Sequence, residues 1–269
     1  MIVFPNGKIN LGLSVLNKRI DGFHNIESVV YPVPIYDVLE FQPSTKFTLS
    51  TYGMQIPGKT EDNIVYKAWE LLQDEYKIPP IEIKLVKGIP IGSGLGGGSS
   101  DAAILIKSLN EYFELGLSAE ILFQLAEKLG SDCPFFIKNS VTMIQGRGEI
   151  LKRLDLSLKG KHIVIVCPEI QISTQEAFQK IQPSKPKIEL SEAISLPIEQ
   201  WQDKLVNDFE ELIFKEHPTL KGIKTILKNE CALYTSLSGS GAAIYGIFDN
   251  ALNVKNKFPD CFVWNGILN

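Results

Sequence analysis

The chain has 269 residues and a mass of 30.0 kDa, enough for one large domain or two small ones. Hydrophobic residues make up 44% and charged residues 22%, as in folded soluble proteins, while the net charge of −4 argues against an electrostatic binder of nucleic acid. The four cysteines show no C-x-x-C spacing and no two of the three histidines are spaced as metal ligands, so we expect reduced thiols and no protein-built metal site. The N-terminus lacks the layout of a signal peptide and no apolar run is long enough for a membrane span. We therefore expect a cytoplasmic protein that binds neither membrane nor nucleic acid, and nothing implies a protein partner.

The first half of the chain is expected to alternate between strands and helices. Short runs of residues with high strand propensity, bounded by Gly, Pro and Asp, predict strands over 9–16, 28–33, 37–42 and 46–51. From residue 62 the apolar residues recur at helical spacing, and Asp62 or Asn63 can cap this helix. Alternation then predicts a strand over 81–86, and a glycine-dense loop over 88–98 precedes predicted helices over 99–113 and 118–129.

The second half mixes both kinds of element. Strands are expected over 141–145 and 162–167, a capping-box spacing of Ser173 and Glu176 starts a helix over 173–181, long helices are expected over 198–216 and 219–230, and a strand–loop–strand covers 233–248. Strict βαβ alternation is missing, so we predict an α+β fold rather than a doubly wound sheet. We expect two domains, residues 1–155 and 156–269.

The most informative segment is 87–103, KGIPIGSGLGGGSSDAA, with five glycines between Gly92 and Gly98. Glycine lets backbone N–H groups approach a ligand closely, and the start of the following helix favours an anion. The hydroxyls of Ser99 and Ser100 can bind phosphate oxygens or a magnesium-bound group. The alternative is a flexible turn whose Ser-Ser-Asp only caps a helix. The strand before it and the apolar helix after it favour a phosphate-binding loop.

Two other kinds of phosphate loop fit less well. Gly92, Gly94 and Gly97 satisfy G-x-G-x-x-G, which leaves an NAD-dependent dehydrogenase as an alternative. That fold needs an acidic residue about 20 positions further on at a strand end, whereas Glu111 and Glu114 lie in or at the end of a helical pattern. A Walker A loop needs a Lys before its Ser or Thr, and this chain lacks it.

Residues 90–102, PIGSGLGGGSSDA, resemble the second motif of the galactokinase–homoserine kinase–mevalonate kinase–phosphomevalonate kinase (GHMP kinase) superfamily. Three further segments are similar to those of the branch that phosphorylates a cytidine diphosphate-linked methylerythritol: 5–11 (PNGKINL), 21–24 (DGFH) and 130–136 (GSDCPFF). A fourth segment, 237–242 (LSGSGA), resembles the superfamily's third motif. The resemblance covers nearly the whole chain.

This resemblance implies a two-lobed α+β fold with the active site in the cleft between the lobes. It implies transfer of a phosphoryl group from ATP, with Mg²⁺ carried on ATP, to the 2-hydroxyl of that substrate in the non-mevalonate pathway to isoprenoid precursors. A kinase for another alcohol, such as homoserine or mevalonate, and a catalytically inactive nucleotide-binding regulator are the alternatives.

The resemblance assigns the catalytic roles to Asp132 and Lys8. Asp132 matches the catalytic aspartate, the base for the attacking hydroxyl, although an aspartate beside Gly and Pro is ordinarily a turn residue. Lys8 matches the lysine that keeps this carboxylate ionised and stabilises developing charge, although a lone lysine is ordinarily a solvated surface residue. Gly7 stands where the family usually has alanine.

The same resemblance places ATP on the glycine loop, with two further contacts. The matched residues are Pro90, Ile91, Gly92, Ser93, Gly94, Leu95, Gly96, Gly97, Gly98, Ser99 and Ser100, together with Asn63 and Lys87. Asn63 can equally be only a helix cap, and Lys87 only a charge at a strand end.

Four residues are assigned to the substrate. Phe23 and His24 match an aromatic–histidine pair that stacks on cytosine and bonds its edge, and Phe178 matches the aromatic that covers the other face. Core packing is the alternative for Phe178. Asn10 lies on the same side of a strand as Lys8 and is expected to contact substrate. Residues 238–241 either close the site from the C-terminal half or form a hairpin-like turn.

Overall fold

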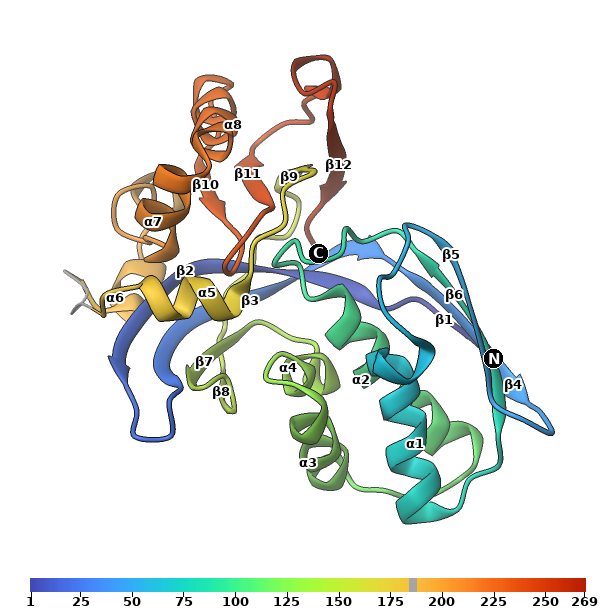
Figure 1. Cartoon of the computed structure of the whole chain (residues 1–269). Helices are drawn as coiled ribbons and strands as arrows, with labels where there is room; N and C mark the ends of the chain where they lie inside the picture. Colours follow the sequence, from blue (N-terminus) through green and yellow to red (C-terminus); the bar gives the residue numbers. More distant parts are fainter. Residues whose placement is uncertain (184–187) are drawn as a thin grey trace. The chain divides into compact units, whose positions relative to one another are not determined.

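The structure is a computed structural model that describes residues 1–183 and 188–269 (Figure 1). Its contacts divide the chain into two compact units, each built from three segments. The first unit comprises Met1–Gly7, Ile35–Ile91 and Gly96–Ser140, and the second comprises Lys8–Pro34, Gly92–Leu95 and Val141–Asn269. The domain boundary at residue 155 and the location of the active site with respect to the lobes stay predictions.

The first unit contains a four-stranded sheet in the order β1-β4-β6-β5. The central strand β6 pairs antiparallel with β4 and parallel with β5. Along β6, Ile81, Ile83 and Leu85 are buried at every second position, so the predicted alternation is confirmed. The strands are β1 (Ile2–Val3), β4 (Val38–Pro43), β5 (Thr48–Gly53) and β6 (Ile81–Lys87).

Four helices complete the first unit, with α1 and α2 packed against the sheet. Phe47 lies with its ring centroid 4.4 Å from that of Trp69 on α1, and Phe41 of β4 meets Tyr112 of α2 at 5.4 Å. The helices are α1 (Ile64–Tyr76), α2 (Gly97–Tyr112), α3 (Ala119–Leu129) and α4 (Cys133–Lys138), and a 3₁₀ turn covers Thr60–Asp62. The helix α4 has only six residues, too few for a period of 3.6 to be visible in the sequence.

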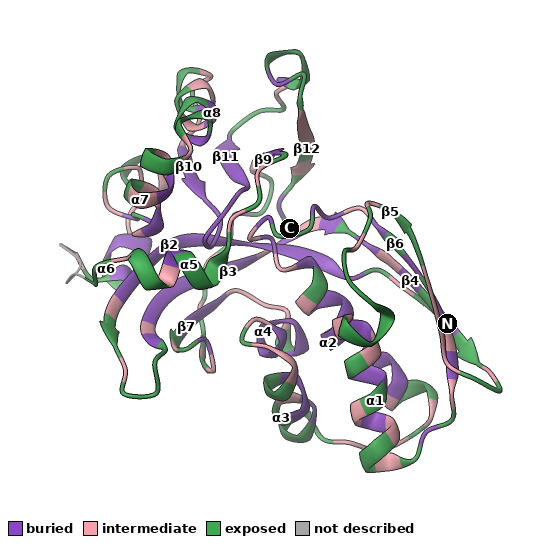
Figure 2. Ribbon diagram, in the orientation of Figure 1, coloured by how far each residue is buried: buried purple, intermediate pink, exposed green. Residues whose placement is uncertain are grey.

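The second unit contains two four-stranded sheets, ordered β2-β3-β7-β8 and β10-β11-β9-β12. Figure 2 shows that β2 and β3 are buried over most of their length, whereas the turn that joins them is exposed. The strands are β2 (Asn6–Lys18, which begins in the first unit), β3 (His24–Tyr36), β7 (Thr142–Gly146), β8 (Ile150–Arg153), β9 (His162–Pro168), β10 (Tyr234–Leu237), β11 (Ile244–Phe248) and β12 (Cys261–Ile267). The sequence did not predict β8 and β12.

The helices of the second unit correct one expectation. They are α5 (Thr174–Lys180), α6 (Leu190–Ile194), α7 (Phe209–Glu216) and α8 (Pro218–Asn229), with 3₁₀ turns at Ile198–Gln200 and Lys255–Lys257. The helix predicted over 198–216 is wrong in its first half, because α7 begins only at Phe209. Leu13 of β2 forms a parallel bridge with Asn207 and bonds the backbone on both sides of it, which holds this stretch extended.

Mixed helices and largely antiparallel sheets agree with the predicted α+β class. In the two described stretches, no helix combines the length and the apolar character needed to cross a membrane.

Candidate active site

The first glycine loop (residues 88–98) leaves β6 and ends inside the first turn of α2. Gly96 precedes α2 with a φ of 72°, a conformation that favours glycine. The first N–H groups of a helix have no partner inside it, and α2 has 16 residues, so its dipole is fully developed. The Ser100 hydroxyl is fully buried and has no hydrogen-bond partner among the described residues. This start of α2 therefore suits an anion that brings its own acceptors.

The start of α1 lies beside the start of α2. Asn63 caps α1, since its Oδ1 accepts the Val65 N–H at 2.9 Å. A Cβ added to Gly98 would lie 3.7 Å from Ile64 Cγ2, so the start of α1 adjoins the first turn of α2. The capping role of Asn63 is confirmed, and its contact with the nucleotide stays a prediction.

Asp132 directly precedes α4 and is half-buried. Burial raises the pKa of the neighbouring Cys133 thiol to about 12, against the effect of a hydrogen bond with Ser99. The start of α4 therefore lies beside the first turn of α2, against which α4 packs. The first unit thus brings Asp132 and the helix start of the glycine loop together, as a carboxylate acting on a bound phosphoryl donor requires.

Lys87, predicted to bind ATP, is buried under the loop. Its ammonium donates to Asp101 Oδ2 at 2.7 Å and to Asp37 Oδ2. Burial alone would lower the pKa of Lys87, but the carboxylates of Asp101 and Asp37 outweigh it and raise that pKa. The lysine is therefore charged and already bonded to two carboxylates, and its contact with ATP stays a prediction.

In the second unit, β2 positions the other catalytic candidate. The Lys8 side chain is buried, and its Nζ donates to Asn10 Oδ1 at 2.7 Å. Asn10 Nδ2 donates in turn to Ser28 Oγ at 2.9 Å, and Ser28 Oγ donates to the Gly12 carbonyl at 2.6 Å. Asn10 thus orients Lys8, and its contact with substrate stays a prediction.

The second glycine loop (residues 238–241) contacts residues 92–95 of the first. Ser238 Oγ donates to the Gly94 carbonyl at 2.9 Å, and the Ala243 N–H donates to the Ser93 carbonyl at 2.9 Å. A Cβ on Gly94 would lie 2.0 Å from the Ser238 carbonyl oxygen, so only glycine fits there. The two loops therefore contact each other. A contact between residues 238–241 and a ligand stays a prediction.

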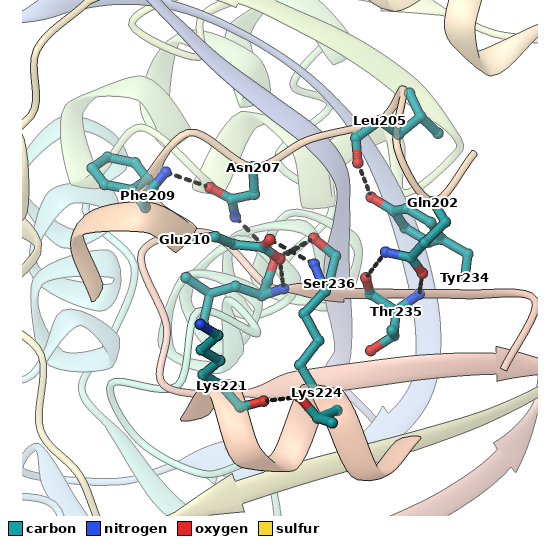
Figure 3. Close-up of polar contacts among 12 residues, drawn as sticks. Gln202, Leu205, Asn207, Phe209, Glu210, Lys221, Lys224, Tyr234, Thr235 and Ser236 are labelled. Atoms are coloured by element: carbon teal, nitrogen blue, oxygen red, sulfur yellow. Dashed lines mark hydrogen bonds and ion pairs between the residues drawn. The ribbon is translucent and has the colours of Figure 1, made fainter. Parts of the chain in front are cut away.

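Side chains of a polar network bond the backbone at the end of β10, where the second glycine loop begins (Figure 3). Asn207 Nδ2 donates to the carbonyls of Leu237 and Gly239 at 2.9 and 2.8 Å. Glu210 accepts the Leu237 N–H at 2.9 Å and pairs with Lys224 at 2.6 Å (Figure 3). The end of β10 and the loop after it are therefore held by side chains from the segment that precedes α7 and from α7 itself.

The aromatic candidates also lie in the second unit. His24 and Phe178 stack with ring centroids 5.4 Å apart, and Phe178 meets Phe209 edge-on at 4.9 Å. Phe23 is 54% exposed, and the Arg147 guanidinium lies 5.1 Å from its ring centroid. Burial lowers the pKa of His24, and Lys18 adds to this shift, so the imidazole is neutral at neutral pH. A neutral imidazole has one donor and one acceptor for the edge of a base.

Sequence reasoning missed several of these partners. Arg147 comes to Phe23 because Gly146 of β7 pairs with Ile26 of β3, and no local pattern announces that pairing. Asp37 and Asp101 were missed because their partner Lys87 is remote in sequence. Among the described residues, no group of three or more His, Cys, Asp or Glu side chains is placed to hold a metal ion.

Comparison with known proteins agrees with this geometry. A model of the GHMP kinases N terminal domain matches residues 63–139, and one of the GHMP kinases C terminal domain matches residues 190–263. A 4-diphosphocytidyl-2-C-methyl-D-erythritol kinase of Bacteroides thetaiotaomicron is 50% identical over 253 residues, which cover 93% of this chain and 92% of that protein. A second such kinase, from Parabacteroides distasonis, is 43% identical over 270 residues, which cover 100% of this chain and 100% of that protein. The chain belongs to the 4-diphosphocytidyl-2-C-methyl-D-erythritol kinase family.

Solved structures extend the comparison. A crystal structure of a 4-(cytidine 5'-diphospho)-2C-methyl-D-erythritol kinase matches with a TM-score of 0.84 and 28% identity, covering 100% of this chain and 99% of that one. The mevalonate kinase of Methanococcus jannaschii matches with a TM-score of 0.71 at 15% identity, covering 100% and 98%, and so shares the fold. The predicted GHMP kinase resemblance and fold are confirmed. The comparisons favour this kinase family over the dehydrogenase and over kinases of homoserine or mevalonate.

Proposed function

We propose that the chain transfers the γ-phosphoryl group of ATP to a hydroxyl of 4-diphosphocytidyl-2-C-methyl-D-erythritol. The resemblance of the sequence motifs implies that this is the 2-hydroxyl. The observation that carries this proposal is the packing of α4, which Asp132 directly precedes, against α2, with Cys133 beside Ser99 in the first turn of α2. The names of relatives that are up to 50% identical indicate the substrate. A cytoplasmic location stays a prediction from the sequence.

In this mechanism ATP lies on the first glycine loop. Backbone N–H groups of the loop and of the start of α2 bind the phosphates, and the unpartnered hydroxyl of Ser100 adds a donor or a ligand. Mg²⁺, carried with ATP, would neutralise the phosphate charge. Its fit here depends on oxygen groups such as Ser100 rather than on a carboxylate cage.

The substrate hydroxyl attacks the γ-phosphorus in line as the bond to the β–γ bridging oxygen breaks, and ADP leaves. Asp132 accepts the hydroxyl proton. Lys8, oriented by Asn10, stabilises negative charge on the reacting oxygens. The cytosine ring stacks on Phe23 while His24 bonds its edge, with Phe178 supporting the imidazole.

The test has two parts. Purified protein should release ADP with the cytidyl substrate at least about tenfold faster than with homoserine or mevalonate at equal concentrations, and ³¹P NMR should show a new phosphomonoester. Equal turnover with the smaller alcohols would contradict the proposed substrate.

Asp132→Asn should lower kcat by about 10²-fold or more, because the base is lost, while the Kd of a non-hydrolysable ATP analogue stays within about twofold. Asp74→Asn, at an exposed position on α1, is the matched control and should behave as wild type. Near-normal turnover by Asp132→Asn would remove Asp132 from the mechanism.

A further inference from the structure

We propose that Asp37, Lys87 and Asp101 form a clamp that positions the first glycine loop for ATP, with Lys87 acting through the two carboxylates rather than by touching the nucleotide. The inference rests on the proposed function, because it takes the loop as the ATP site. It changes the role predicted for Lys87 and adds two residues that the motifs did not assign.

The three side chains come from three different elements of the first unit. Asp37 lies between β3 and β4, Lys87 is the last residue of β6, and Asp101 is the fifth residue of α2. Their side chains are 0%, 3% and 2% exposed. Groups buried this deeply and bonded to each other hold fixed positions, since moving one would leave a charge without compensation.

The clamp grips both ends of the loop. Asp37 Oδ1 accepts the N–H groups of Gly88 at 2.6 Å and Ile89 at 2.8 Å, the first two residues of the loop. The Lys87 ammonium joins Asp37 to Asp101, which lies on the helix that ends the loop. The start of that helix also packs on Asp37, because a Cβ added to Gly97 would lie 3.3 Å from Asp37 Oδ2.

In this arrangement the Lys87 ammonium is not available to bind the phosphates of ATP directly. Its ammonium would have to give up one of two buried carboxylates to reach a phosphate. Asp101 Oδ1 has no partner among the described residues, and burial raises the pKa of Asp101 to about 8 against the pull of Lys87, with Asp37 adding to the rise. Lys87 is therefore held in place by both carboxyl groups and is not free to reach a phosphate.

Calorimetric titration with a non-hydrolysable ATP analogue tests the clamp, with the unfolding temperature of each variant measured alongside. Lys87→Met and Asp101→Ala should each raise the Kd by about tenfold, because the loop ends shift. The double variant should bind no worse than Lys87→Met, since the two residues act as one unit. Asp101→Asn should bind within about twofold of wild type, because its amide oxygen still accepts the Lys87 N–H and Asp37 still balances the charge of the ammonium.

The matched control is Lys128→Met, which breaks the exposed 2.6 Å pair with Glu75 in the same unit and should leave the Kd unchanged. Unchanged or tighter binding by Asp101→Ala beside weaker binding by Lys87→Met would overturn the clamp, because Lys87 would then contact ATP itself. Lower unfolding temperatures with unchanged Kd values would overturn it in favour of a purely structural cluster. If Lys87→Met does not fold, the two Asp101 variants decide. Failure of the wild type to bind the analogue would instead refute the proposed function.

Discussion

The first glycine loop and the aromatic cluster (Phe23, His24, Arg147 and Phe178), the two proposed binding regions, are built by different physical means. The loop is made of backbone, is tied at its start by Asp37 and is touched by Ser238. The aromatic cluster consists of side chains from turns, from the first residue of β3 and from a short helix, with Phe23 54% exposed. In the proposed function, phosphate recognition is therefore built into the fold before ligand arrives, whereas base recognition depends on a few side chains near the surface.

This difference has a consequence for mutation. A side chain at Gly94 of the loop must move backbone, since its Cβ meets the Ser238 carbonyl. A change in the aromatic cluster removes one contact and leaves the rest of the structure in place. We expect loop variants to lose stability and ATP binding together, and cluster variants to lose only affinity for the pyrimidine substrate.

The largest effect is expected for Gly94→Ala. The new Cβ would lie 2.0 Å from a backbone oxygen, and Gly94 has a φ of +79°, so the two glycine loops must separate. We expect kcat/KM for ATP to fall by about 10²-fold, together with a lower unfolding temperature. Gly160→Ala is the control, because Gly160 has a φ of +84° with nothing within 4 Å of the added Cβ. Equal loss of activity in both variants would show that backbone strain alone, and not contact between the loops, matters.

A smaller effect is expected for Phe23→Ala. Stacking of a base on an aromatic ring contributes about 1–3 kcal/mol, so KM for the cytidyl substrate should rise by about tenfold while KM for ATP stays unchanged. Phe23→Tyr keeps the ring and should stay within about twofold of wild type. Ile20→Ala, in the same exposed turn, is the control. A rise in KM for ATP alone would place the pyrimidine site elsewhere.

Arg147→Ala should have the smallest effect. A guanidinium over an exposed aromatic ring contributes about 0.5–1 kcal/mol, so KM for the cytidyl substrate should rise by about two- to fivefold with kcat unchanged. Arg153→Ala, exposed on β8, removes the same charge nearby and should not change KM. Tighter substrate binding by Arg147→Ala would mean that the guanidinium covers the face of Phe23 that the base uses.

Local sequence predicted those parts of the fold that depend on neighbouring residues. The caps at Asn63 and Ser173 are confirmed, because a capping side chain bonds an N–H two or three residues away. The alternation in β6 and the helix after the glycine loop are also confirmed, because both patterns depend on residues close together in the sequence. The start of α7 was placed too early, because a bridge to Leu13, almost 200 residues away in the chain, keeps residue 207 extended.

The candidate site divides in the same way. The position of the glycine loop at the start of a helix was predictable because it depends on consecutive residues, whereas the catalytic roles of Asp132 and Lys8, assigned through short motifs, stay predictions.

By itself, the sequence determined the glycine loop at the start of a helix, the α+β class and the kinase resemblance, since each depends on residue type and local spacing. Only the tertiary structure decided that Lys87 pairs with Asp37 and Asp101, that Arg147 lies over Phe23 and that the second glycine loop touches the first. These contacts join residues up to 144 positions apart, and strand pairing and burial create them rather than any pattern along the chain.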